Sequence, residues 1–177
     1  MKDKLGKYYP IIALTVVVFI SVAILSGMDS FTRDTIQYQK ELKIQRMLNQ
    51  LFPEMSAYEF DESTEIYTIS SDGSKVGYAF LAVGTGYGGE IDIVVGLENR
   101  TTMRGIAVIS HAETPGLGDK ILTPNFTDRF VGLDTGEINL TRDGGKVDAI
   151  TGATISSRAV VDSVRAATMA KAELIPD

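Results

Sequence analysis

The sequence predicts an α+β fold, in which a twisted antiparallel sheet and its flanking helices follow one N-terminal transmembrane helix. Three observations carry this prediction: an uncharged apolar run near the N-terminus, short β-type runs separated by turn residues, and helical patterns on both sides of those runs. The chain therefore divides into residues 1–28, a cytoplasmic tip and transmembrane helix, residues 29–53, a juxtamembrane helix, and residues 54–177, a single domain.

The apolar run extends from Tyr8 to Met28 without a charged residue. About 20 apolar residues suffice to cross a bilayer as a helix, whereas the apolar core of a cleaved signal peptide is only about 7–15 residues long. No A-x-A-like cleavage site follows the run, so a retained anchor in membrane lipid is favoured over a signal peptide. The charge rule does not settle its orientation, because basic residues lie on both sides: Lys2, Lys4, Lys7, Arg33, Lys40 and Lys43.

The composition excludes several classes of site. The chain has no cysteine, which excludes disulfides, iron–sulfur clusters and zinc–thiolate sites, and its single histidine, His111, argues against a histidine-rich metal or haem site. Any electrons would therefore need an organic cofactor. The formal net charge is −6 and becomes more negative without the first seven residues, so no nucleic-acid partner is expected.

The soluble part begins with a helix that ends at Phe52-Pro53 and packs Ile44, Leu48 and neighbouring apolar residues against its own domain. Two β-hairpins follow. "EIYTIS" pairs with "KVGYAFLAV" across Ser71–Ser74, and "EIDIVVGLE" pairs with "RGIAVISHAE" across "NRTTM".

The remaining elements are short until the C-terminal helix. "TPNFTDRF" predicts a helical turn with Thr123 as its cap and Pro124 at its first position. "TRDGG" predicts a third turn between "INL" and "KVDAIT". A final helix is expected from about Ser156 to Leu174, with an apolar face that includes Val160, Val164 and Leu174.

The string "GTGYGG", residues 84–89, matches the G-x-G-x-x-G pattern of dinucleotide-binding proteins. That fingerprint requires a helix directly afterwards, whereas "EIDIVVGL" alternates like a strand. A glycine-rich turn that approaches another group closely is the better interpretation, and a plain hairpin turn is the alternative. Tyr87 could cover a ligand there.

The loop "HAETPGLGDK", residues 111–120, follows a strand directly and contains a proline and two glycines. Its lone histidine and glutamate make no catalytic constellation without a nucleophile or a metal. Loops of this kind often carry function, and a rigid structural turn is the competing interpretation.

The string "TGAT", residues 151–154, directly precedes the final helix. Gly152 and Ala153 leave the Thr154 hydroxyl open to an enzyme, and Ser156 and Ser157 lie in the first helical turn. A helix start presents free N–H groups that suit a phosphate, although ordinary N-capping explains one hydroxyl equally well.

Three stretches together resemble the FMN-binding domain family: "DAITGATISS", "HAETPGLGDKI" and "GYGGEIDIVVGL", behind one membrane span. The family occurs in the G subunit of the Rnf complex and in the related C subunit of the sodium-translocating NADH:quinone reductase. The length of the chain is closer to that of the Rnf G subunit. The resemblance implies that Thr154 carries FMN through a phosphoester bond.

The resemblance also implies roles for other residues. Asp148, Gly152, Ala153 and Thr154 would be recognised by a flavin transferase, and no metal is implied. The flavin would contact residues of all three stretches: Tyr87, Glu113, Thr114, Gly116, Leu117, Gly152, Ala153, Ser156 and Ser157.

By the same resemblance, the chain is a single-pass subunit of the cell membrane with its FMN domain on the extracytoplasmic side. It would relay electrons among the other Rnf subunits, in a translocase that couples ferredoxin oxidation to ion translocation, and would not be catalytic alone. The alternative is a membrane-anchored binding or sensory module of the same fold without a redox cofactor. A free-standing flavin reductase would need its own nicotinamide site, and the sequence contains none.

Overall fold

The computed structural model describes the backbone of residues 2–175 and the side chains of residues 8–24, 26 and 39–175. It contains two compact units, Met1–Leu42 and Lys43–Asp177. Helix α1, Lys2–Leu51, continues from the first unit into the second, so the segments expected as a membrane span and a juxtamembrane helix form one continuous helix.

In the first unit, the large apolar side chains between Tyr8 and Ile24 are exposed. Among the helices as far as they are described, none has the length and apolar character needed to span a membrane.

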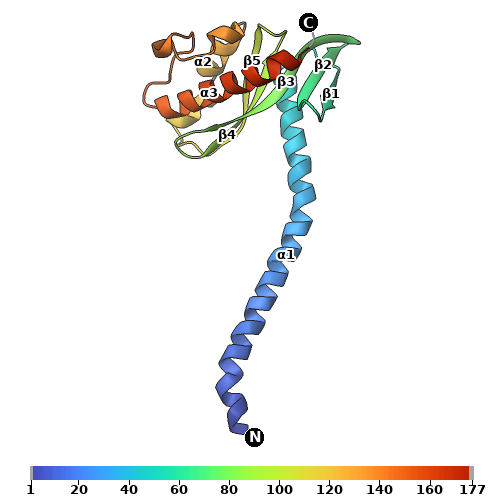
Figure 1. Ribbon diagram of the computed structural model, residues 1–177, viewed down its shortest axis with the longest axis vertical. Helices are drawn as coiled ribbons and strands as arrows, with labels where there is room; N and C mark the ends of the chain where they lie inside the picture. The colour runs from blue at the N-terminus through green and yellow to red at the C-terminus, as the bar shows by residue number, and fades with distance from the viewer. Residues whose placement is uncertain (1, 176–177) are drawn as a thin grey trace. The chain divides into compact units, whose positions relative to one another are not determined.

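The second unit is built on a five-stranded sheet in which every neighbouring pair is antiparallel, in the order β1-β2-β3-β4-β5 (Figure 1). The strands are β1 Ala57–Asp61, β2 Ile66–Ser71, β3 Ser74–Thr85, β4 Glu90–Leu97 and β5 Met103–His111. Both expected hairpins are confirmed. The first turns at Asp72 and Gly73, whose φ angles of 49° and 80° are those of the tight turn that suits a right-twisted hairpin.

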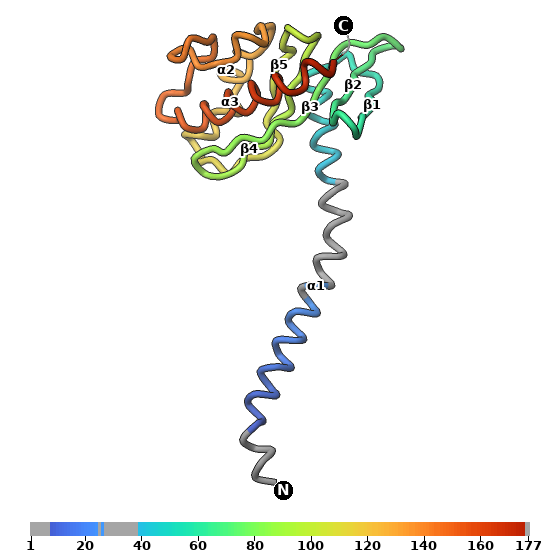
Figure 2. The backbone as a smooth tube through the Cα atoms, viewed as in Figure 1, coloured from blue at the N-terminus to red at the C-terminus, as the bar shows by residue number. Residues whose placement is uncertain are grey.

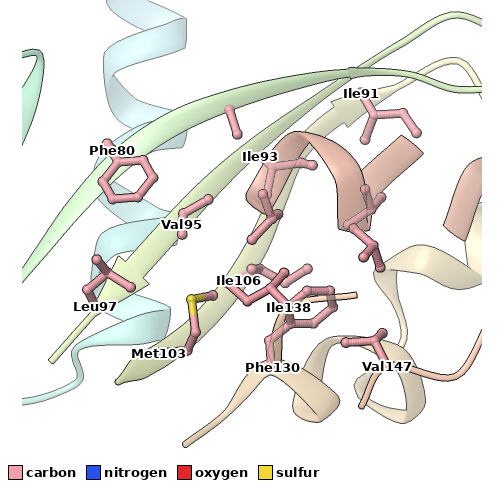
Figure 3. Packing of buried hydrophobic residues seen from close by; sticks show 14 of the residues in the cluster. Phe80, Ile91, Ile93, Val95, Leu97, Met103, Ile106, Phe130, Ile138 and Val147 are labelled. Carbon is pink, nitrogen blue, oxygen red and sulfur yellow. The ribbon is translucent and has the colours of Figure 1, made fainter. Parts of the chain in front are cut away.

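One face of the sheet packs against helix α3, Thr154–Lys171, and the segment before it. Alternate residues of β4, Ile91, Ile93 and Val95, enter this core together with Phe80 of β3, because successive strand residues point to opposite faces (Figure 3). Val160 and Val164 of α3 are fully buried in it, as the helical periodicity predicted. Leu174 lies beyond the end of α3 and is exposed, so its expected place on the buried face was wrong.

The opposite face of the sheet packs against the last turns of α1. Ile44, Leu48 and Phe52 are buried there with Val94 of β4, so the expected packing of this helix on its own domain is confirmed. The Phe52 ring occupies space that glycine leaves open: a Cβ at Gly77 would lie 2.5 Å from its Cε1 atom.

Between β5 and α3 the chain makes short turns (Figure 2). The α-helical one is α2, Pro124–Thr127, with proline at its first position as expected. Thr123 is the N-cap residue as expected, but its side chain makes no capping hydrogen bond, because its hydroxyl donates to the Lys120 carbonyl. The 3₁₀ turns are Gly118–Leu122, Asp128–Phe130, Thr135–Glu137 and Thr141–Asp143, with Ala172–Leu174 after α3.

The end of α3 is tied to the β1–β2 turn. The Lys171 ammonium donates to Glu65 Oε2 at 2.8 Å, and this hydrogen bond together with the lysine charge lowers the pKa of Glu65. The N-terminal end of α3 lies near the β3–β4 hairpin and forms part of the candidate site (Figure 1).

Candidate functional site

The first turn of α3 exposes a short segment of small residues. Gly152 has a φ of +82°, a left-handed conformation that favours glycine, and a Cβ there would lie 3.1 Å from Leu117 Cδ1. Ala153 is buried, and Thr154 is the first helical residue and partly exposed. The N–H groups of Thr154, Ile155 and Ser156 precede the first helical hydrogen bond, which Ser157 donates to Ala153.

The hydroxyls of this segment differ in their availability. Ser157 is fully buried, and its Oγ accepts from the Ile150 N–H and donates to the Ala153 carbonyl. Ser156 is also buried, and its hydroxyl donates to Glu113 at 2.6 Å. Among the described residues, the Thr154 hydroxyl has no hydrogen-bond partner. Thr154 therefore presents the free hydroxyl at the start of the helix.

The loop after β5 is a tight turn organised by one carbonyl. The Thr114 carbonyl accepts from the N–H groups of Leu117, Gly118 and Asp119. Gly116 adopts a φ of +78° with open space where a side chain would stand, so it shapes the backbone. This supports the competing interpretation, a rigid structural turn, and the turn positions Glu113 and Leu117.

Residues 86–89 of the glycine-rich string form the β3–β4 hairpin loop, and a strand follows them, so a dinucleotide-binding fingerprint is excluded as expected. The β3–β4 hairpin loop comes close to the loop after β5. A Cβ at Gly88 would lie 2.1 Å from the Ala112 carbonyl oxygen, and one at Gly86 would lie 2.1 Å from Glu113 Oε1. Tyr87, between these glycines, is 74% exposed.

Glu113 joins the three segments. Its side chain is only 5% exposed, and Oε1 accepts from the Gly88 N–H at 3.0 Å while Oε2 accepts from Ser156. Its own N–H donates to His111 Nδ1. The hairpin, the loop and the helix start are therefore linked through one buried carboxylate.

These segments enclose a cavity of about 300 Å³, called here the hairpin cavity. Its lining residues are Tyr87, Glu113, Thr114, Leu117, Gly118, Gly152, Ala153, Thr154, Ile155 and Ser156. Most residues expected to contact a ligand are thus brought together. Gly116 and Ser157 are not in the lining, since the first shapes the loop backbone and the second points into the helix.

A larger cavity of about 500 Å³ also borders the helix start and is called here the arginine cavity. Thr154 and Ile155 line both cavities. The arginine cavity also contains Arg142 and Arg158, and both guanidinium groups lie near the Asp143 carboxylate, at 3.8 and 2.7 Å. Thr154 therefore lines both the hairpin cavity, which contains Glu113, and the arginine cavity, which contains Asp162 beside the two arginines.

Asp148 lies outside both cavities. Its carboxylate accepts from the Thr141 hydroxyl at 2.7 Å and lies 3.8 Å from the Arg129 guanidinium, while its side chain stays largely exposed. It is thus both anchored in the fold and accessible from outside.

This arrangement suits a flat aromatic ligand with a phosphate. Tyr87, Leu117 and Ile155 are exposed large apolar side chains that line the hairpin cavity, and a few polar groups accompany them, as is typical of cofactor sites. The free N–H groups and the free hydroxyl at the helix start suit a phosphate.

Sequence reasoning missed Ile155 and Gly118. Ile155 follows Thr154 in a helical pattern, where an isoleucine is typical of core, yet it is exposed. Gly118 was part of the recognised loop, and its role is steric: a Cβ there would lie 2.4 Å from Glu113 Oε2. The contact lies within one loop, but it depends on the tight turn that brings Gly118 back to the Glu113 side chain.

Comparison with protein families finds the FMN-binding domain over residues 86–168. This range contains the hairpin loop, the loop after β5 and most of α3, and thus every residue of both cavities except Val83, Gly84 and Thr85.

Curated relatives are named as G subunits of the ion-translocating oxidoreductase complex. The protein of Aliivibrio fischeri is 34% identical over 83% of this chain and 81% of its own length. The protein of Vibrio vulnificus is 36% identical over 76% and 74%. The protein of Methanosarcina acetivorans is 45% identical over 56% of this chain, and the match spans about half, 53%, of that relative's length.

Among solved structures, the C subunit of the Na⁺-translocating NADH-quinone reductase of Parabacteroides distasonis is similar, with a TM-score of 0.52 and 23% identity over 63% of each chain. This likeness concerns the fold, an antiparallel sheet with helices.

Proposed function

This chain belongs to the family of ion-translocating oxidoreductase complex G subunits, and on that premise we propose that it is a membrane-anchored flavoprotein that relays electrons through FMN bound covalently to Thr154. The observation that carries the proposal is the meeting of Thr154 with residues of the hairpin and of the loop after β5 around one cavity. The flavin, when bound, accepts electrons and passes them on. The chain itself holds and orients it.

Thr154 is the proposed point of attachment because it is partly exposed and its hydroxyl has no hydrogen-bond partner among the described residues. Ser156 and Ser157 are engaged in hydrogen bonds inside the fold, and Thr151 lines neither cavity. A phosphoester at Thr154 would lie beside the free N–H groups of the first turn, whose partial positive charge favours an anion. Arg158, one helical turn further on, lines the same cavity as Thr154 and supplies a cation.

The isoalloxazine ring is proposed to occupy the hairpin cavity. Leu117 and Ile155 offer apolar contacts, Tyr87 can cover the ring from the hairpin, and Thr114 and Gly118 complete the loop side. The covalent tether removes the need for a deep pocket, because a tethered cofactor cannot diffuse away. An exposed edge also leaves the flavin accessible to another protein of the complex for electron transfer.

A flavin transferase is proposed to recognise the segment from Asp148 to Thr154. The Asp148 side chain is largely exposed while Thr141 and Arg129 fix its position, so a second protein can contact it in a defined place. The small side chains at Gly152 and Ala153 keep the path to the Thr154 hydroxyl open. The residue proposed for recognition, Asp148, and the proposed acceptor, Thr154, thus lie in one short segment of the chain.

The protein is proposed to act within the Rnf complex, which couples ferredoxin oxidation to ion translocation, rather than as an enzyme alone. Its electron donor and acceptor would be other subunits. The alternative, a binding or sensory module without a redox cofactor, differs in one visible property. The full chain co-expressed with a flavin transferase is expected to purify yellow, with flavin absorbance that persists after denaturation and gel filtration. A colourless, folded protein under these conditions would favour the alternative.

The first part of α1 is proposed to anchor the chain in the membrane, with residues 1–7 inside and the FMN domain outside the cytoplasm. Support comes from the uncharged run Tyr8–Met28 and from the exposed apolar side chains between Tyr8 and Ile24. A reporter enzyme that works only outside the cytoplasm, fused after Asp177, is therefore expected to be active. Activity of a cytoplasmic reporter at the same position, with silence of the first, would reverse the orientation.

A further inference from the structure

Glu113 is a buried acid whose two oxygens bond to neutral donors. Oε1 accepts from the Gly88 N–H at 3.0 Å and Oε2 accepts from the Ser156 hydroxyl at 2.6 Å. A backbone N–H can only donate, and a hydroxyl-to-oxygen distance of 2.6 Å is that of a charge-assisted hydrogen bond. Both oxygens of Glu113 are therefore engaged by hydrogen-bond donors inside the fold.

The surrounding chain leaves room for this carboxylate. A Cβ at Gly86 would lie 2.1 Å from Oε1 and a Cβ at Gly118 would lie 2.4 Å from Oε2. Two segments therefore approach Glu113 through glycines, and any larger residue there would displace the acid. The position of the charge is fixed by the backbone on both sides.

A buried charge on Glu113 would cost folding free energy. Glu113 is 5% exposed and forms no ion pair with the residues that the structure describes. A buried charge without a counter-charge destabilises a fold, and a neutral hydrogen-bonding side chain would link the same segments without that penalty. Such a local conflict is expected where a residue serves the site rather than the fold.

We infer that Glu113 is a fixed negative charge that lowers the midpoint potential of the flavin held in the hairpin cavity. The inference rests on the proposed function, since it places the ring beside the residues that line this cavity with Glu113. Each electron that reaches the flavin adds a negative charge unless a proton follows. A carboxylate close to the ring raises the energy of that reduced form, and the potential falls.

The test variant removes the ionisable group of Glu113 and keeps its hydrogen bonds to Gly88 and Ser156. In Glu113→Gln the side-chain carbonyl can still accept from the Gly88 N–H, and the amide NH₂ can donate to the Ser156 Oγ, because a hydroxyl both accepts and donates. The flavin-loaded full chain is titrated spectroelectrochemically. Glu113→Gln is expected to shift the midpoint potential upward, whereas the control Glu137→Gln, at an exposed glutamate outside both cavities, is expected to leave it unchanged.

A second variant covers the case in which Glu113→Gln does not fold. Thr114 lines the same cavity with an exposed side chain, and its organising group is the backbone carbonyl, which a substitution leaves in place. Thr114→Lys adds a positive charge there and is expected to shift the potential upward as well.

The outcomes separate this inference from the proposed function. Flavin attachment is checked first, by the mass of the denatured chain, and a wild-type chain without flavin overturns both. If the flavin is attached but Glu113→Gln has the wild-type potential, Glu113 is only a structural link. If Glu113→Gln is unfolded and Thr114→Lys leaves the potential unchanged, charge in this cavity does not act on the flavin.

Discussion

Thr154→Ala is expected to abolish covalent flavin attachment completely, while the domain stays folded. The substitution removes the one hydroxyl of the helix start that has no hydrogen-bond partner among the described residues. Thr154 is partly exposed at the first position of α3, where alanine is the better helix former, so the free energy of unfolding is expected to change by no more than about 0.5 kcal/mol. In-gel fluorescence of the denatured chain and its far-ultraviolet circular dichroism measure the two effects.

Thr151→Ala is the matched control, because Thr151 is a second exposed threonine three residues away that lines neither cavity. It is expected to keep the fluorescent adduct. The reverse pattern, with fluorescence retained in Thr154→Ala and lost in Thr151→Ala, would mean that the attachment site is Thr151.

Phe52→Ala is expected to destabilise the second unit by about 3–5 kcal/mol, the range for removing a fully buried aromatic side chain. The Phe52 ring is 0% exposed and packs with Leu48 and Val94 between the end of α1 and the sheet. Gly77 and Gly96 leave space for this ring, so alanine would open a cavity that neighbouring backbone cannot fill. Urea unfolding of the full chain, followed by circular dichroism, measures the loss.

Phe60→Ala is the control for this prediction. Phe60 lies on the edge strand β1, is 44% exposed and contacts the Tyr67 ring at 4.5 Å between centroids. Loss of this surface pair is expected to cost about 0.5–1.5 kcal/mol. Equal losses in the two variants would show that Phe52 does not anchor the helix to the sheet.

Four of the five strands were predictable from the sequence because their signals are local, whereas β1, Ala57–Asp61, was not predicted as a strand. Alternation in "EIDIVVGLE" and the Asp72-Gly73 turn specify hairpins within a few residues, and the antiparallel neighbours follow the chain order. The absence of a side-chain capping hydrogen bond from Thr123 was not predictable in this way. Its hydroxyl donates to Lys120 because the preceding 3₁₀ turn brings that carbonyl within reach.

The candidate site was predictable in its residues and not in its geometry. The strings around Glu113 and Thr154 identified the segments, but Glu113 meets Gly88 and Ser156 across 25 and 43 positions of the chain. Such distant contacts depend on how the helix packs on the sheet. The same limit explains Ser157, which shares a helical turn with Thr154 but is turned inward to bond with Ala153 and Ile150.

The most direct measurement is the site of the flavin in the wild-type chain. Trypsin cleaves after Lys146 and Arg158, and the peptide between them, "VDAITGATISSR", contains Thr151, Thr154, Ser156 and Ser157. Fragmentation of this peptide, from chain co-expressed with a flavin transferase, is expected to place the added mass of FMN less one water on Thr154. The same mass on Thr151, Ser156 or Ser157, or an unmodified peptide, would contradict the proposed attachment.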